Sequence, residues 1–223
     1  MEIMDAIRAR HSVRSYTDQT IEGETLAQLR QAVADCNRES GLHIQLCLDE
    51  PTGFSGAMAR YGKFSNVKNY IALVGKKDAS LDEACGYYGE KLVLQAQQLG
   101  LNTCWVALTF SKGSSKQAVQ INPGEKLLMV ISLGYGETSG VPHSSKPMEK
   151  LCKVSGAMPD WFQRGMEAAQ LAPTAMNQQK FMLELDGEAV KASSGLGFYT
   201  KVDLGIVKYH FEVAAGKENC RWA

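Results

Sequence analysis

The first residues of this chain that could do chemistry are two arginines and a serine at alternating positions, Arg10, Ser12 and Arg14. In an extended segment alternate side chains point to the same side, so two guanidinium groups and a hydroxyl would face one point. Arginine offers forked N–H donors that match phosphate oxygens. The spacing is therefore typical of a phosphate-binding segment, and it also fits a solvated basic turn.

A second polar group lies far along the chain, in a loop between an apolar helical run and an alternating strand. Pro173 biases the preceding residue away from the helical region, so the helix is expected to end there. Thr174, Asn177 and Gln179 follow, and the strand pattern begins at Phe181. Small polar side chains of this kind bond to nearby backbone or to the edge of a ligand. Both an ordinary helix-to-strand connection and a ligand-contacting loop remain open at this point.

Apolar periodicity predicts the elements that must position these two groups, and together they indicate an α+β fold. The predicted helices are residues 2–9, 25–34 and 82–99, and the predicted strands are residues 42–48, 70–74, 125–134 and a strand from 181. Gly100 is a natural end for the longest helix, and a further strand follows it up to Val106.

Composition excludes several classes of protein. The chain has 24 Lys and Arg against 24 Asp and Glu, so no general basic surface for nucleic acid or membrane lipid is expected. No apolar run is long enough to span a membrane, and the first residues do not resemble a signal peptide. The six cysteines form no CxxC pair and the four histidines show no ligand spacing, so we expect reduced thiols, a cytoplasmic location and no metal site.

Three stretches together resemble the FMN-dependent nitroreductase family: residues 8–16, residues 99–106 and the loop at residues 172–179. The resemblance covers nearly the whole chain, although in that family the loop usually follows the first segment closely. It implies a nitroreductase-like fold with a central mixed or antiparallel sheet flanked by helices. It also implies bound FMN, with no catalytic side chain because the flavin carries the chemistry.

The resemblance assigns candidate FMN-binding residues one by one. Those implied for the phosphate are Arg10, His11, Ser12, Arg14 and Lys146; for the pyrimidine, Lys63; for the reactive edge, Ala107 and Leu108; and for the ring, Pro173, Thr174, Ala175, Asn177 and Gln179. Glycine is common in the family where this chain has Leu108, so this departure could narrow the pocket.

The C-terminal part of the chain resembles an earlier part, which indicates an internal duplication. A shift of 137 residues places Ala32 on Ala169, and a shift of 119 places Gly86 on Gly205. We therefore predict two halves, residues 1–150 with the phosphate segment and residues 151–223 with the flavin-ring loop. Because family members are usually homodimers, such a chain would be a monomeric pseudo-dimer, or a weak homodimer, with one complete FMN site.

By this resemblance the chain is expected to be an FMN-dependent NAD(P)H oxidoreductase that transfers hydride by a ping-pong scheme. NADH or NADPH would be the donor, and a small nitroaromatic, quinone or enone the acceptor. The alternatives are an FMN carrier or sensor without turnover and an α+β interaction domain without cofactor. His210 and Glu212 could serve as an acid and a base, but we expect them to pack in a helix interface.

Overall fold

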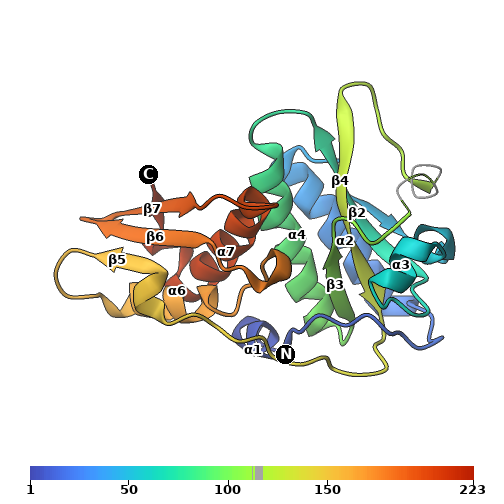
Figure 1. Cartoon of the computed structure of the whole chain (residues 1–223), viewed down its shortest axis with the longest axis horizontal. Helices are drawn as coiled ribbons and strands as arrows, with labels where there is room; N and C mark the ends of the chain where they lie inside the picture. Colours follow the sequence, from blue (N-terminus) through green and yellow to red (C-terminus); the bar gives the residue numbers. More distant parts are fainter. Residues whose placement is uncertain (112, 114–117) are drawn as a thin grey trace. The chain divides into compact units, whose positions relative to one another are not determined.

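The computed structural model describes residues 1–111, 113 and 118–223, which form helices and strands in mixed order (Figure 1). The helices are α1 (Ile3–Ala9), α2 (Gly23–Ser40), α3 (Ala57–Tyr61), α4 (Leu81–Gln98), α6 (Asp160–Ala169) and α7 (Thr200–Ala215). The strands are β1 (Gln45–Cys47), β2 (Asn69–Lys76), β3 (Asn102–Val106), β4 (Glu125–Gly134), β5 (Cys152–Val154), β6 (Phe181–Asp186), β7 (Ala189–Ser194) and β8 (Arg221–Trp222). The predicted α+β class is confirmed.

The described residues gather into two compact units that the chain enters more than once. The first unit holds Met1 and residues 9–81 and 92–142, and the second holds residues 2–8, 82–91 and 143–223. Helix α4 therefore gives its first part to the second unit and its last part to the first. The predicted halves at 1–150 and 151–223 stay a prediction.

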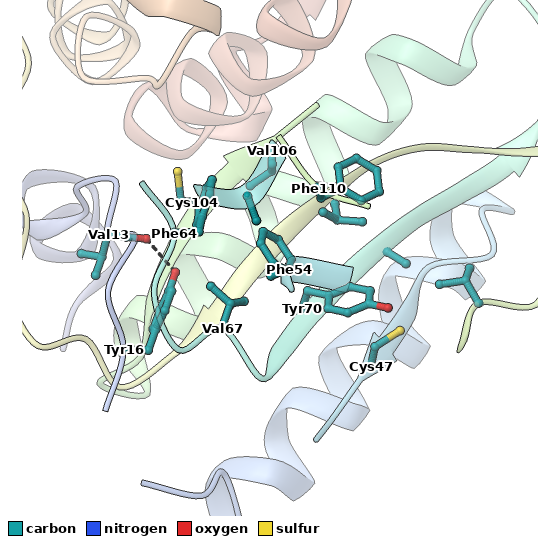
Figure 2. Packing of buried hydrophobic residues seen from close by; sticks show 14 of the residues in the cluster. Val13, Tyr16, Cys47, Phe54, Phe64, Val67, Tyr70, Cys104, Val106 and Phe110 are labelled. Atoms are coloured by element: carbon teal, nitrogen blue, oxygen red, sulfur yellow. Dashed lines mark hydrogen bonds between the residues drawn. The ribbon is translucent and has the colours of Figure 1, made fainter. Parts of the chain in front are cut away.

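The first unit is built on an antiparallel sheet with strand order β1-β2-β4-β3. Strand β2 is buried from Tyr70 to Gly75, which is why its sequence is a continuous apolar run. A core of aromatic and branched side chains packs on this sheet (Figure 2). Val13 and Tyr16, from the predicted phosphate segment, belong to that core.

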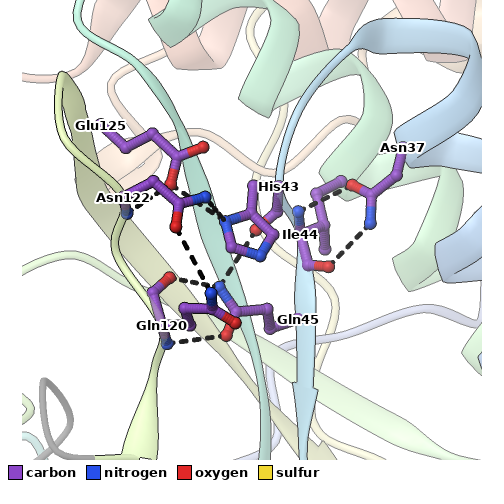
Figure 3. A network of polar contacts seen from close by, with 7 residues as sticks. All are labelled: Asn37, His43, Ile44, Gln45, Gln120, Asn122 and Glu125. Carbon is purple, nitrogen blue, oxygen red and sulfur yellow. Dashed lines mark hydrogen bonds and ion pairs between the residues drawn. The ribbon is translucent and has the colours of Figure 1, made fainter.

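Strand β1 is shorter than the predicted strand at 42–48, and side chains bond the residues just before it (Figure 3). The Asn37 amide donates to the Ile44 carbonyl at 2.8 Å and accepts from the Ile44 N–H at 2.7 Å, so Ile44 is tied to helix α2. His43 Nδ1 lies 3.0 Å from a Glu125 carboxylate oxygen. The His43 N–H still donates to the Val74 carbonyl of β2 at 2.8 Å, while the regular ladder with β2 pairs Gln45–Cys47.

The second unit has its own sheet, with strand order β5-β6-β7-β8. Strands β6 and β7 are antiparallel, and the outer strands β5 and β8 pair in parallel. Strand β6 begins at Phe181 as predicted, with Phe181, Leu183 and Leu185 buried in alternation. The sequence suggested one central sheet, whereas the described residues form two four-stranded sheets, because the strands of each unit pair only among themselves.

Within the second unit, α7 crosses the first part of α4 at two glycines. A Cβ on Gly205 would lie 2.0 Å from the Glu83 carbonyl oxygen, and a Cβ on Gly86 would lie 2.1 Å from the Val202 carbonyl oxygen. The shift of 119 residues relates Gly86 to Gly205 and Glu83 to Val202, so the contacts are reciprocal. Reciprocal contacts are the pattern of a two-fold interface. The internal duplication remains a prediction, and this reciprocity supports it.

Candidate functional site

The predicted phosphate segment is fixed to strand β3 through its main chain. Ser12 pairs with Thr103 in a parallel bridge, and the Val13 N–H donates to the Thr103 carbonyl at 3.0 Å. The Tyr16 hydroxyl donates to the Val13 carbonyl at 2.7 Å, and burial raises the pKa of Tyr16. The segment is therefore extended and anchored by two buried side chains of the first core.

Two glycines, one at the end of β4 and one just after it, make room for this anchoring. A Cβ on Gly134 would lie 2.9 Å from the Tyr16 ring, and a Cβ on Gly136 would lie 2.9 Å from a Val13 methyl group. Real Cβ atoms essentially never approach that closely. Gly134 and Gly136 thus allow the segment to lie against the end of the sheet.

The two arginines of the segment act on the same buried thiol. Burial raises the pKa of Cys104, while the charge of Arg14, a hydrogen bond with Ser12 and the charge of Arg10 lower it. Arg10 is only 4% exposed, whereas Arg14 is exposed. Placement of the side chains of Arg10, Ser12 and Arg14 on one side of the segment stays a prediction.

The loop that carries Lys63 lies beside the same segment. The Ser65 N–H donates to the Arg14 carbonyl at 2.9 Å, and the Arg14 guanidinium lies 5.9 Å from the centroid of the Phe64 ring. Lys63 has a positive φ of 60°, which orients the chain at this turn.

The stretch after β3 joins this loop. A Cβ on Gly62 would lie 2.7 Å from the Thr109 Cβ, so Thr109 lies against the loop that carries Lys63. Ala107 is half-buried and Leu108 is 60% exposed. His11 is half-buried, with its Cβ 2.8 Å from the position of a Cβ on Gly140. The first unit thus holds all seven candidates from its own part of the chain: Arg10, His11, Ser12, Arg14, Lys63, Ala107 and Leu108.

The second unit holds the remaining candidates, which are Lys146 and the candidates of a tightly bonded loop from Pro173 to Gln179. Three residues without a glycine's freedom have positive φ there: Met176 (52°), Asn177 (53°) and Gln179 (45°). The Gln179 N–H donates to the Thr174 hydroxyl at 3.0 Å, and the Asn177 N–H donates to the Thr174 carbonyl at 2.9 Å. Thr174 therefore closes the loop on itself.

The polar side chains of this loop are largely used within the second unit. Gln179 is 4% exposed; its amide accepts from the Lys146 N–H at 2.7 Å and donates to the Ser144 carbonyl and to Asn177 Oδ1. The Lys146 ammonium donates to the carbonyls of Gln178 and Gln179 at 2.8 and 3.0 Å. The roles of these residues toward a flavin stay predictions, as does one site drawn from both halves.

Sequence reasoning did not identify Asp203 as a residue of this region. Its carboxylate accepts from the Ala175 N–H at 2.9 Å and from the Gln178 side-chain amide at 2.7 Å. The only sequence signal is an acidic residue in the first turn of a predicted helix, which helices favour for general reasons.

His210 and Glu212 lie in a packed interface, as expected. His210 is fully buried, with one ring nitrogen 2.8 Å from a Glu90 carboxylate oxygen and the other 3.0 Å from the Ala168 carbonyl. Glu212 accepts from the Tyr87 hydroxyl at 2.8 Å and from the Trp222 indole at 3.1 Å. These contacts account for both side chains by packing.

In the described part of the chain, no group of three or more His, Cys, Asp or Glu side chains is arranged to hold a metal ion. Among the same residues, no helix combines the length and apolar character that crossing a membrane requires.

The fold is that of nitroreductases. A "putative nitroreductase" of Thermotoga maritima superposes with a TM-score of 0.66 at 22% identity, covering 98% of this chain and 85% of that one. A nitroreductase family protein of Streptococcus pneumoniae gives 0.54 at 14% identity, covering 67% and 98%. A protein of Desulfovibrio desulfuricans solved in complex with FMN gives 0.52 at 18% identity, covering 67% and 94%.

A sequence model of the family described as "Putative TM nitroreductase" matches residues 2–215. The chain therefore belongs to that family, which confirms the resemblance seen in its motifs. No curated protein matches the sequence.

Proposed function

We propose that this chain is an FMN-dependent oxidoreductase that uses NADH or NADPH to reduce a small acceptor such as a nitroaromatic, a quinone or an enone. The chemistry that FMN supplies when bound is acceptance of a hydride and delivery of electrons to the acceptor. The observation that carries the proposal is the concentration of positive charge where segment 10–14 meets strand β3.

The donor set in the first unit fits the phosphate of FMN. Arg10, Ser12 and Arg14 alternate along an extended segment that pairs with β3, and the loop that carries Lys63 is hydrogen-bonded to the Arg14 carbonyl. Guanidinium and ammonium groups with a hydroxyl are the donors that a phosphate dianion prefers. The chain's own residues would thus bind and orient the cofactor through its phosphate.

The FMN-bound relative from Desulfovibrio desulfuricans supports FMN as the ligand by analogy of fold. Assignment of the ring contacts to Thr174, Ala175, Asn177 and Gln179 rests on the family motif and stays part of the proposal. The same holds for Ala107 and Leu108 at the reactive edge.

A second candidate function is an FMN carrier or sensor without turnover, and Leu108 favours it. This side chain is 60% exposed directly after β3, where the family commonly has glycine. A bulky side chain there could keep a nicotinamide from stacking. In that case Leu108→Gly should accelerate the reduction of bound FMN by NADH or NADPH several-fold.

The visible spectrum of purified protein, recorded before and after anaerobic addition of NADH or NADPH, tests both functions. Flavin bands that bleach within the time of mixing support the oxidoreductase. Bands that persist favour the carrier. A protein that stays colourless and binds no added FMN would contradict both.

A further inference from the structure

The buried carboxylate of Asp203 holds both ends of a short turn in the second unit. Asp203 is 3% exposed and lies in the first turn of α7. Its Oδ1 atom accepts from the Ala175 N–H at 2.9 Å, and its Oδ2 atom accepts from the Gln178 Nε2 at 2.7 Å. Between these two partners lie only Met176 and Asn177.

The turn between these partners has an unfavourable backbone conformation that other contacts must stabilise. Met176 and Asn177 have φ near 52° and 53°, and Gln179 has 45°. A left-handed conformation is unfavourable for residues other than glycine and persists only where surrounding contacts over-determine it. Bonds to Thr174 close the loop from within, but Asp203 is the contact that ties its two ends to a helix.

A carboxylate suits this role better than a neutral side chain. An ionised carboxylate is an acceptor on both oxygens, so it satisfies two N–H donors at once. Hydrogen bonds to a charged acceptor are also roughly twice as strong as neutral ones. Burial raises the pKa of Asp203 to about 6, so the side chain is ionised at neutral pH.

Contacts of helix α7 fix the position of the Asp203 carboxylate. The Asp203 N–H donates to the Tyr199 carbonyl at 2.9 Å, and α7 packs against α4 without a side chain at Gly205. The Gln178 amide donates to the Phe198 carbonyl at 2.8 Å as well, which ties the turn to the segment just before the helix.

We propose that Asp203 is a positioning residue that fixes the conformation of the Thr174–Gln179 loop, and through it the affinity and redox behaviour of bound FMN. The part that concerns FMN rests on the proposed function. The part that concerns the loop does not, because it follows from contacts inside the second unit.

The test compares Asp203→Asn with Glu212→Gln in the full chain. Both variants replace a buried acid on α7 by its amide, but Glu212 bonds to Tyr87 and Trp222 and not to the loop. In Asp203→Asn one amide oxygen can still accept from Ala175, while its NH2 group faces the NH2 group of Gln178. Amide hydrogen exchange at Ala175 should then rise about tenfold in the cofactor-free protein. In Glu212→Gln it should stay unchanged.

With FMN bound, Asp203→Asn should raise the dissociation constant about tenfold and shift the midpoint potential of the flavin, whereas Glu212→Gln should do neither. Gln178→Ala, a milder change at the other partner, should increase exchange in the same direction. Unchanged loop exchange in a folded Asp203→Asn protein would overturn the proposal. Faster loop exchange with unchanged FMN affinity and potential would overturn its FMN part. If wild-type protein binds no FMN, the proposed function fails, and the exchange experiment still decides the role of Asp203 in the loop.

Discussion

The two segments expected to meet a flavin differ in how they are held. Segment 10–16, in the first unit, is fixed by main-chain bonds from Val13 to Thr103 and from Ser65 to Arg14, and by the buried side chains of Val13 and Tyr16. The loop from Thr174 to Gln179, in the second unit, is fixed by side chains, those of Thr174, Asp203, Gln179 and Lys146.

The difference teaches what each segment can offer to a ligand. Main-chain anchoring leaves the Arg14 side chain exposed, so the first segment can present charge. In the loop, most polar side chains are used to hold a strained backbone, and Met176 is 94% exposed at its tip. The loop therefore offers a fixed shape. A phosphate is recognised by charge and a planar ring by shape, which suits these two kinds of construction.

The largest effect is expected from Gly205→Ala, which disturbs the packing of α7, the helix that carries Asp203. The new methyl group would meet the Glu83 carbonyl oxygen at 2.0 Å, so α7 and α4 must separate. Overpacking of this kind costs about 3 kcal/mol. Urea unfolding should report the loss. Gly195→Ala is the matched control, because its nearest neighbour would be at 3.5 Å and it should cost far less. Equal stability of both variants would contradict a tight helix crossing.

Arg14→Ala tests the charge of the first segment. Loss of charge-assisted hydrogen bonds should raise the dissociation constant of FMN about 100-fold, measured by fluorescence quenching of the flavin on titration. Arg8→Ala is the control, since Arg8 pairs with Asp5 and its side chain is 64% exposed. An unchanged affinity in Arg14→Ala would remove the phosphate assignment.

The free energy of unfolding should depend on pH through the buried carboxyl group of Asp203, which bonds to the Thr174–Gln179 loop. Burial raises the pKa of Asp203 from 3.8 to about 6 in the folded protein. Between these values the folded state keeps a proton that the unfolded state has lost. The stability contributed by the protonated carboxyl is therefore present below about pH 4, is lost as the pH rises to about 6, and stays lost above it.

This contribution can be measured as the difference in unfolding free energy between wild type and Asp203→Asn. The difference should fall by roughly 2 kcal/mol as the pH rises through that window. Asp186→Asn is a control of opposite sign, because a hydrogen bond from Lys191 lowers the pKa of Asp186. The free energy of unfolding of wild type should rise relative to that of Asp186→Asn as the pH rises through the ordinary pKa range of an aspartate. A flat profile for Asp203→Asn would show that the carboxylate is not buried in solution.

The smallest effect is expected from Asn177→Ala, which changes both a side-chain bond and the backbone preference of the loop. The Asn177 amide donates to the Ser144 carbonyl at 2.9 Å, and alanine tolerates the positive φ less well. FMN affinity should fall about tenfold. Asn177→Gly removes the same hydrogen bond, but glycine tolerates the positive φ. FMN affinity should therefore fall less in Asn177→Gly than in Asn177→Ala. If both variants bind FMN like wild type and only lose stability, the loop does not serve the flavin.

Much of the fold followed from local pattern alone. Helix α4 was predicted at 82–99 and spans Leu81–Gln98, and β4 was predicted at its observed bounds, Glu125–Gly134. Apolar periodicity of this length reports burial of one face, which does not depend on the partner. The motifs behind the family resemblance were equally local, and the matched family model confirms membership of that family.

Other features depended on partners that the sequence does not pair. The strand predicted at 42–48 pairs regularly with β2 only at Gln45–Cys47, although the His43 N–H still donates to Val74 of β2. An alternating run reports that one face is buried, and it does not report how far the neighbouring strand continues to pair with it.

The sequence by itself determined the α+β class, the charge of segment 10–14 and the polar character of the loop after Pro173, because these depend on residue type and short spacing. Only the tertiary structure decided that Asp203 holds that loop and that Gln179 and Lys146 bond to each other. Those contacts join residues 25 to 33 positions apart, and no local pattern specifies which distant partner a buried polar group will find.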